Sequence, residues 1–436
     1  NAFRTCRKQC VAHVHANGRN RSSARRSASI NAFAPRFQSG RLVNGAGCAL
    51  MEQAMIRALL VGVSVAALMA SPAFADPGNS SDIYQENTGN AAYVDQVNSY
   101  WGSSSVISQT GPANLANILQ SDDGAPVGDV AGNASNIDQS GHDNIANVTQ
   151  DNSGSLGDEA EANSSDISQH GGLSDASVYQ SGAGSASYIT QDGYVQSASV
   201  DQSGPGDNSS NVDQDGSGNQ AFVLQANSSD VAVLSSDLLQ MGNDHLADIT
   251  QFGEDGSSSM VQEGESQLAS LYQDSYGGGS LVSDIIQSEA YNFASVNQSG
   301  AQAGSSLDQS GEFQTATVSQ ISFSSAGLYS TITQTESQNI ADVTQVGDGY
   351  IESVIEQADS FNSATVVQVG GDLYSEIRQT WGDGNTAIVT QSGPMATSYI
   401  SQEGYGHLAE VNQISGVAAA SWITQFGTGN IAVVNQ

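Results

Sequence analysis

The side chains that could act in catalysis are serine, histidine and the carboxylates, and they are not grouped as catalysis requires. Serine recurs at one fixed place in a repeated segment, but no histidine or aspartate recurs beside it. A serine hydroxyl without an adjacent base is a weak nucleophile. Of the four histidines beyond residue 75, His245 and His407 stand where other copies of the segment have an amide, while His142 and His170 stand alone. The sequence therefore predicts no catalytic residue and no enzyme.

The residue types that bind metals are equally scattered. All three cysteines, Cys6, Cys10 and Cys48, precede residue 50, so the rest of the chain can form neither a disulfide nor a thiolate metal site. The Gly-Gly-x-Gly-x-Asp repeat of calcium-binding β-rolls is missing from the sequence. We predict no metal site and no cofactor. Weak binding of divalent cations by the acidic links between segments stays open.

The polar groups that do recur are side-chain amides. A segment of two glutamines separated by ten residues occurs fifteen times, with one longer copy, Gln379–Gln391. In each copy the fifth residue after the first glutamine is Asn, Gln, His or Ser, the seventh is Ala and the ninth is usually Val, with each position one later in the longer copy. Serine always lies four residues before the first glutamine, and Ile, Leu, Val or Met lies two residues before it.

These positions alternate with a period of two, which is typical of β-strands. Each segment then contains two strands joined by a short turn, usually with glycine at its second position, where a positive φ is often needed. A single repeat of this size cannot bury its narrow apolar face, whereas stacked repeats bury a continuous one. We predict an all-β, cross-β solenoid of about 15 strand-turn-strand repeats, with two strands per turn.

In such a stack the amides of one column lie above one another. We expect each side-chain amide to donate to the carbonyl oxygen of its neighbour along the axis, because a buried amide without a partner costs about 1–3 kcal/mol. The ladders would fix the register as well as stabilise the fold, since a slip by one residue turns every inward column outward. The predicted ladder and assembly residues are Gln85, Gln96, Gln139, Asn144, Gln150, Gln214, Asn219, Gln225, Gln334, Asn339, Gln345, Gln425, Asn430 and Gln436.

The amino-terminal part of the chain has a different composition from the repeats. Met55-Ile-Arg, an apolar stretch and the ending Ala-Phe-Ala predict a secretory signal peptide over 51–75. Residues 1–50 are rich in Arg and Ser and do not begin with Met. This composition is also that of an organelle transit peptide, but we interpret residues 1–50 as an extraneous or mis-annotated extension, with Met51 or Met55 the true start. A short mature leader, 76–80, then precedes the repeats at 81–436.

The charge of the chain excludes some partners. The formal net charge is −34, and after residue 75 there are 44 acidic residues and one basic residue, Arg378. Phosphate contacts require Lys and Arg, so we expect no nucleic-acid partner. We also expect no membrane insertion once the signal is removed.

The pattern Gln-x-Gly-x-x-Asn-x-Ala-x-Val-x-Gln resembles the curlin repeat of bacterial curli fibres. It occurs almost letter for letter in Gln139–Gln150 and in Gln425–Gln436, and the resemblance extends over 81–436. The resemblance implies a subunit that leaves the periplasm through a dedicated outer-membrane pore, meets a nucleator at the cell surface, and assembles into amyloid for adhesion and biofilm.

We therefore expect a secreted structural subunit that forms a homopolymeric cell-surface fibre. The final repeat is intact and uncharged, which favours a major subunit, and it ends on the ladder position Gln436 without a capping segment. Open solenoid ends expose unpaired strand edges that pair with further strands. The alternative is a monomeric secreted β-solenoid that acts as an adhesin or binds ice.

Overall fold

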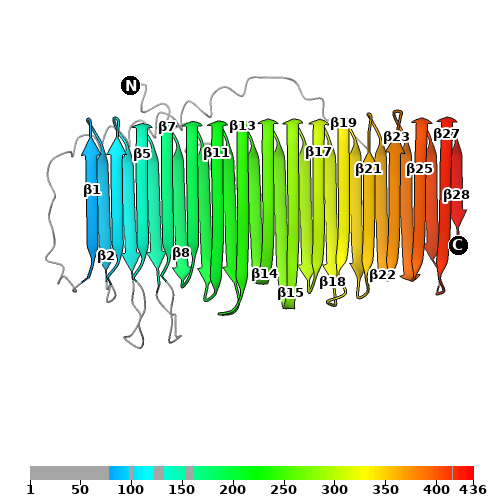
Figure 1. The fold of residues 1–436 in the computed structure, drawn as a ribbon, viewed down its shortest axis with the longest axis horizontal. Coiled ribbons are helices and arrows are strands. Elements are labelled where there is room, and N and C mark those ends of the chain that lie inside the picture. Colours follow the sequence, from blue (N-terminus) through cyan, green and yellow to red (C-terminus); the bar gives the residue numbers. More distant parts are fainter. Residues whose placement is uncertain (1–77, 98–101, 122–131, 153–161, 415) are drawn as a thin grey trace, which may run out of the picture. The chain divides into compact units, whose positions relative to one another are not determined.

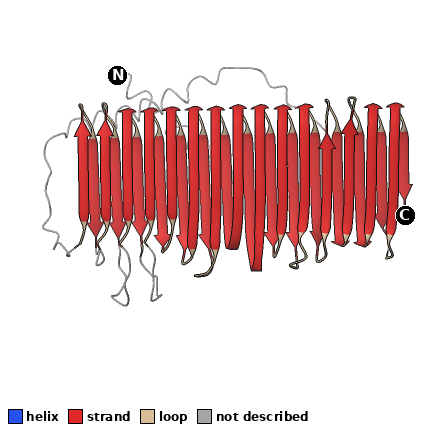
Figure 2. Cartoon of the chain, viewed as in Figure 1, coloured by secondary structure: helices blue, strands red, loops and turns tan. Residues whose placement is uncertain are grey.

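The structure of this protein is a computed structural model that describes residues 78–97, 102–121, 132–152, 162–414 and 416–436. The predicted extension, the signal peptide and the first two residues of the leader lie outside these ranges. The regular structure within them consists of β-strands (Figure 2). Across the described ranges, no helix has the length and hydropathy of a membrane span.

The strands form two columns of parallel segments (Figure 1), because odd-numbered strands pair with odd-numbered ones and even with even. Two long strands pass through a corner and contribute a segment to each column, so each column holds fifteen segments. The first column contains β1 (Ser80–Glu86), β3 (Ser104–Thr110), β5 (Ala134–His142), β7 (Ser164–Gly172), β9 (Ala186–Tyr194), β11 (Asp207–Ser217), β13 (Val233–Asn243), β17 (Ala303–Glu312), β19 (Leu328–Ser337), β21 (Ile351–Gln357), β23 (Leu373–Thr380), β25 (Ala396–Tyr405) and β27 (Ala419–Thr428). The second contains β2 (Ala91–Val97), β4 (Leu115–Ser121), β6 (Ile145–Asp151), β8 (Asp175–Gly182), β10 (Ser197–Gly204), β12 (Gln220–Asn227), β16 (Phe293–Gly300), β18 (Thr315–Ser322), β20 (Ile340–Gly347), β22 (Ser363–Gly371), β24 (Thr386–Pro394), β26 (Leu408–Ile414) and β28 (Ile431–Asn435). The two long strands are β14 (Leu246–Glu265) and β15 (Leu268–Ala290).

Equivalent residues of successive turns lie beside one another. Gln139 pairs with Gln169, and Ile137 with Ile167. The same register holds in the second column, where Ala146 pairs with Ala176. The predicted all-β solenoid with two strands per turn is therefore confirmed.

The interior is narrow and is filled by the columns that the sequence predicts. Along the strands of the interior turns, buried side chains alternate with more exposed ones. Ile107 and Ile137 of the first column are fully buried, and they share one hydrophobic cluster with Ala146 and Val148 of the second. Burying an isoleucine or valine side chain stabilises the fold by about 1.5–3 kcal/mol. A core this narrow can hold the fold together because the cluster continues from turn to turn.

Glycine at the second position of the corner allows successive turns to approach closely. Gly141, Gly171 and Gly193 have φ values of 114°, 119° and 130°. A Cβ atom added to Gly171 would lie 1.9 Å from the carbonyl oxygen of Gly193 in the next turn, so the stack has no space for a side chain there.

We predict that Gly171→Ala lowers the free energy of local unfolding by at least about 3 kcal/mol, since it combines a strained φ with overlap against backbone. Gly384→Ala is the matched control: this glycine also has a positive φ of 71°, but a Cβ would have no atom within 4 Å. The control should lose only about 1 kcal/mol. Amide hydrogen exchange in the flanking turns measures both, and equal losses would contradict the close-approach explanation.

Candidate functional site

Two ladders of glutamine side chains run through the interior. In each ladder every glutamine Nε2 donates to the Oε1 of the glutamine in the next turn, at distances between 2.6 and 3.0 Å. In the first column the contacts run without a gap from Gln85 to Gln425. In the second they run from Gln96 to Gln436. The donor always lies on the amino-terminal side, so both ladders have the same direction.

The second N–H of each interior amide holds the two columns together. Gln214 in the first column also donates to the backbone oxygen of Ser197 in the second, and Gln225 in the second donates to Ser209 in the first. A primary amide offers two N–H donors and one carbonyl oxygen. Gln214 and Gln225 are fully buried, yet both N–H groups and the carbonyl oxygen of each side chain have hydrogen-bond partners inside the stack.

The asparagine column differs from the prediction. Asn144, Asn219, Asn339 and Asn430 do lie in one column, but their side chains do not bond to one another. The Oδ1 of Asn339 accepts the backbone N–H of Asn362 in the next turn, and its Nδ2 donates to the backbone oxygens of Thr335 and Asp359. The asparagine side chain is one methylene shorter than glutamine and lies directly after the corner, so it reaches corner carbonyls instead of the next side chain.

His245 reproduces the asparagine pattern with its ring. Its Nδ1 accepts the N–H of Gln267 at 3.3 Å, and its Nε2 lies 3.2 Å from the backbone oxygen of Met241. These contacts correspond to a neutral ring with the proton on Nε2. Burial lowers the pKa of His245 below its ordinary value of 6.5. This geometry agrees with the interpretation of His245 as a substitute for an amide.

The recurring serine has no base beside it. Ser210 and Ser236 are buried, and their Oγ atoms lie 3.4 Å from the Nε2 of a ladder glutamine. Other members of the column, such as Ser353 and Ser375, have no hydrogen-bond partner for Oγ. In the described ranges the small serine therefore fills the space beside the glutamine ladder.

The interior position six residues before the first glutamine of each segment was not predicted from the sequence. In the amino-terminal turns this position is polar. The Oδ1 of Asn133 accepts the backbone N–H of Asn163, and the Oδ1 of Asn163 accepts the backbone N–H of Ser185. From Leu281 onward it is apolar and forms a second core cluster. Because the residue type changes partway along the chain, the position does not stand out as a recurring column. Its members in the second cluster are Leu281, Ala303, Leu328, Ile351, Leu373 and Ala396.

Charged groups lie on the outside of the stack. Burial raises the pKa of Asp213 above its ordinary value of 3.8, and the nearby charges of Asp215 and Asp192 raise it further. Any stability that Asp213 contributes is thus present below pH 3.8 and is lost as the pH rises through the raised pKa. Arg378 pairs with Glu356 at 3.2 Å and with Glu376 at 3.0 Å.

Asp201 and Tyr374 on the surface also have shifted pKa values. Burial also raises the pKa of Asp201. Partial burial and a hydrogen bond to Glu376 raise the pKa of Tyr374 to about 12. Burial is the largest cause of both shifts, and for Tyr374 the carboxylates of Glu376 and Glu352 add to it.

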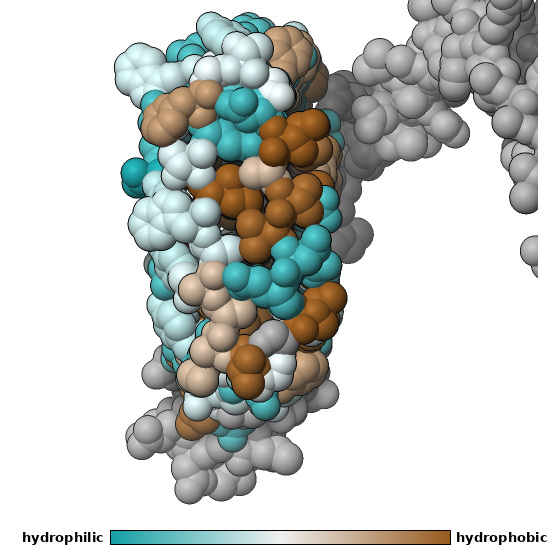
Figure 3. All heavy atoms as spheres, turned by 90° about the vertical axis from the view of Figure 1, so that its right-hand side faces the viewer, coloured by the Kyte–Doolittle hydropathy of each residue, from teal (hydrophilic) through white to brown (hydrophobic). Residues whose placement is uncertain are grey.

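The two end turns leave interior groups uncovered by the described residues. Ile83 in β1 is 44% exposed, whereas Ile107, one turn further in, is fully buried. At the other end, Gln436 is exposed and Val434 only partly buried. Figure 3 looks onto this carboxyl-terminal end and shows apolar side chains gathered between polar ones.

A family model described as the curlin associated repeat matches residues 361–393. The matched stretch contains β22, β23 and all of β24 except its last residue, so this part of the solenoid is a curlin-related repeat. No curated protein matches the chain.

We predict that Gln214→Leu destabilises the neighbouring turns by about 1–3 kcal/mol for each orphaned partner. The donor of Gln191 and the acceptor of Gln240 would both lose their contacts. Gln220→Leu is the matched control, because this glutamine is exposed on the outside of β12. Chemical denaturation followed by hydrogen exchange measures the difference, and similar losses for both variants would argue against the ladder as a source of stability.

A second prediction concerns pH. Because the pKa of His245 is lowered in the fold, its contribution to stability is present above pH 6.5 and is lost as the pH falls through the lowered pKa. Protection of the Gln267 amide against hydrogen exchange should decrease over that range after correction for intrinsic exchange. His245→Asn should remove the decrease, whereas His170→Asn, at an exposed histidine, should leave it. A decrease that persists in His245→Asn would contradict the assignment.

Proposed function

We propose that this chain is a structural subunit of extracellular curli-like amyloid fibres, which grow by stacking the carboxyl-terminal turn of one copy on the amino-terminal turn of the next. The observation that supports this most strongly is the unbroken, one-directional course of both glutamine ladders. Among the described residues, the glutamines of the first turn accept no hydrogen bond from another ladder glutamine and those of the last turn donate none.

The end turns are complementary atom by atom. If stacking continues the register seen between interior turns, Gln425 of one copy donates to Gln85 of the next, and Gln436 donates to Gln96. The backbone N–H of Asn90 then donates to the Oδ1 of Asn430, as the N–H of Asn114 donates to Asn90 within the chain.

The same stacking continues the apolar core across the junction, and it covers Ile83, which is 44% exposed in the single copy. The interior residue Ile83 of the second copy would cover Ile423 of the first, and Val94 would cover Val434. Head-to-head contact would place two donor ends or two acceptor ends together, so the proposed fibre is polar.

The biological setting is part of the proposal. The signal-like stretch 51–75 supports export to the periplasm, and the curlin-related repeat supports passage through a curli-type outer-membrane pore, a separate nucleator and a role in adhesion and biofilm. In this proposal the recurring side chains are structural and not catalytic. The acidic outer surface would slow lateral clumping of subunits and fibres.

The purified protein should form seedable fibres that bind thioflavin and give a meridional reflection at about 4.7 Å. A chain that stays monomeric for days at high concentration would instead support the alternative, a solitary adhesin or ice-binding solenoid.

We further predict that the double variant Gln425→Leu, Gln436→Leu blocks elongation at one fibre end. Its amino-terminal turn still docks on a wild-type seed, but its own carboxyl-terminal turn lacks the two donors. Fluorescence microscopy of seeds with a trace of variant should show that one end stops while the other grows. The control Thr424→Leu, Asn435→Leu changes exposed residues of the same two strands and should leave both ends growing. Equal growth at both ends with the double variant would refute templating through the ladders.

A further inference from the structure

One corner of the solenoid carries a row of aromatic side chains with a gap in it. Tyr291, Phe313, Gln338 and Phe361 occupy the same corner position in four successive turns, each with a φ close to 60°. Backbone hydrogen bonds link each turn of the row to the next: the N–H of Gln338 donates to Glu312, and that of Phe361 to Ser337. The row therefore has an aromatic ring in every turn but one.

The first two rings of this row are stacked on one another along the solenoid. Tyr291 and Phe313 stack with centroids 4.9 Å apart and ring planes 9° from parallel. One face of Phe313 is thus covered by Tyr291, and its other face points toward the gap. Phe361 lies two turns from Phe313, a distance of about 9.6 Å at the usual spacing of parallel strands.

The gap is an open groove of about 600 Å³ between these two rings. Ile340 adds an apolar wall and is 51% exposed. Thr315 and Ser363 supply hydroxyls at its rim, and Gln338 supplies an amide. No hydrogen bond from these three side chains to the described residues is present, so they are free to bond to a ligand.

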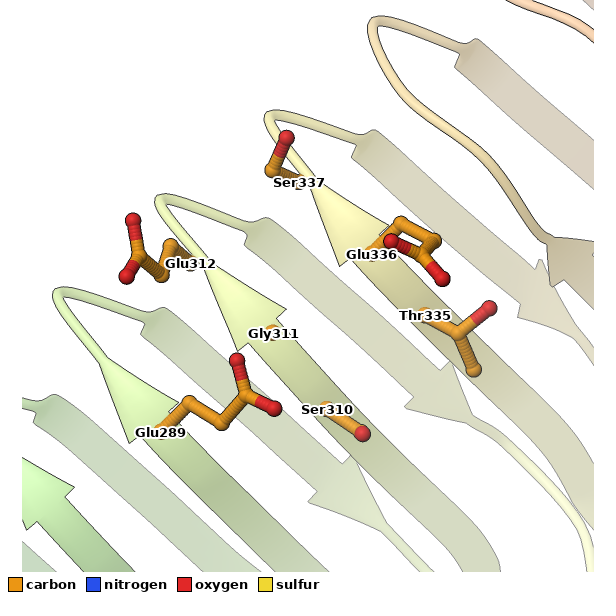
Figure 4. A pocket seen from close by; sticks show the side chains of 7 residues that line it. All are labelled: Glu289, Ser310, Gly311, Glu312, Thr335, Glu336 and Ser337. Atoms are coloured by element: carbon orange, nitrogen blue, oxygen red, sulfur yellow. The ribbon is translucent and has the colours of Figure 1, made fainter.

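Charge restricts what the groove can hold. Its lining residues are all uncharged, although the chain carries 45 acidic residues. On the adjoining part of the corner, Glu289, Glu312 and Glu336 follow one another in successive turns (Figure 4). An anionic ligand would be repelled by these carboxylates, and a cation would find no charged partner inside the groove.

We infer that this groove binds a neutral pyranose unit of a polysaccharide. The two faces of a pyranose ring present C–H groups that pack against aromatic rings, while its hydroxyls point outward from the rim. Two contacts at van der Waals distance plus the thickness of a puckered ring fill a separation of about 9.6 Å between rings. The amide and the two hydroxyls lie where the sugar hydroxyls need partners. The inference does not depend on fibre formation, because one molecule contains the whole groove.

The test titrates the full chain with neutral gluco-, malto- and chito-oligosaccharides and with an oligouronate, followed by saturation-transfer NMR and calorimetry. We expect binding of at least one neutral series and none of the oligouronate. Phe361→Ala should weaken binding by about tenfold. Phe222→Ala is the matched control, because this phenylalanine is 42% exposed on β12, away from the groove, and should bind as wild type.

The decisive variant is Gln338→Phe. A phenylalanine is accepted at this backbone position, since Phe313 and Phe361 have the same positive φ. It would complete the aromatic row, fill the groove and abolish sugar binding, while thioflavin-positive assembly and hydrogen-exchange protection stay at least as strong. The inference would be overturned if Gln338→Phe bound sugar as the wild type does, or if Phe222→Ala lost as much binding as Phe361→Ala. It would also be overturned if the oligouronate bound as well as the neutral sugars, or if no neutral series bound.

Discussion

The structure depends on one constraint, the burial of a primary amide in the strands of every interior turn. A buried amide must find partners for two N–H groups and one oxygen. In a stack of equal turns, the same amide one turn away is always within reach as such a partner. This requirement fixes the register of both columns together, because Gln214 bonds along its own column and also to the opposite strand. A shift of one column alone would break the ladder and the cross-links at once.

The ladder leaves the outside of the stack free to vary. Links of different length separate the segments, and the outward positions hold acids, hydroxyls and aromatic rings without disturbing the register. In the described ranges this freedom produces two surfaces a few residues apart at one corner, the acidic stretch around Glu312 and the uncharged groove at Gln338. Functions of the surface can therefore change by substitution while the interior stays the same.

The interior was predictable from the sequence to the degree that residue types recur. Ile137, Ala146 and Gln150 stand in strict columns, and period-two alternation identified their strands and their inward direction. The bonding of Asn339 was not predictable, because it depends on the distance from a short side chain to the corner carbonyls. The position of Asn133 and Leu281 was missed because its polarity changes along the chain. The groove could not be found either, since it depends on ring stacking at an outward corner position whose residue type does not recur along the chain.

The change from polar to apolar residues six positions before the first glutamine should make the two parts of the solenoid differ in stability. An aliphatic side chain such as Leu328 contributes about 1.5–3 kcal/mol when buried, whereas a satisfied asparagine such as Asn163 contributes about 0.5–1.5 kcal/mol net. The turns from Leu281 to Ala396 carry both hydrophobic clusters, and we expect them for this reason to be the more stable part. In a solenoid each turn is stabilised mainly by its neighbours. Folding should accordingly begin in the carboxyl-terminal turns and extend toward β1, with the glutamine ladders passing the register from one turn to the next.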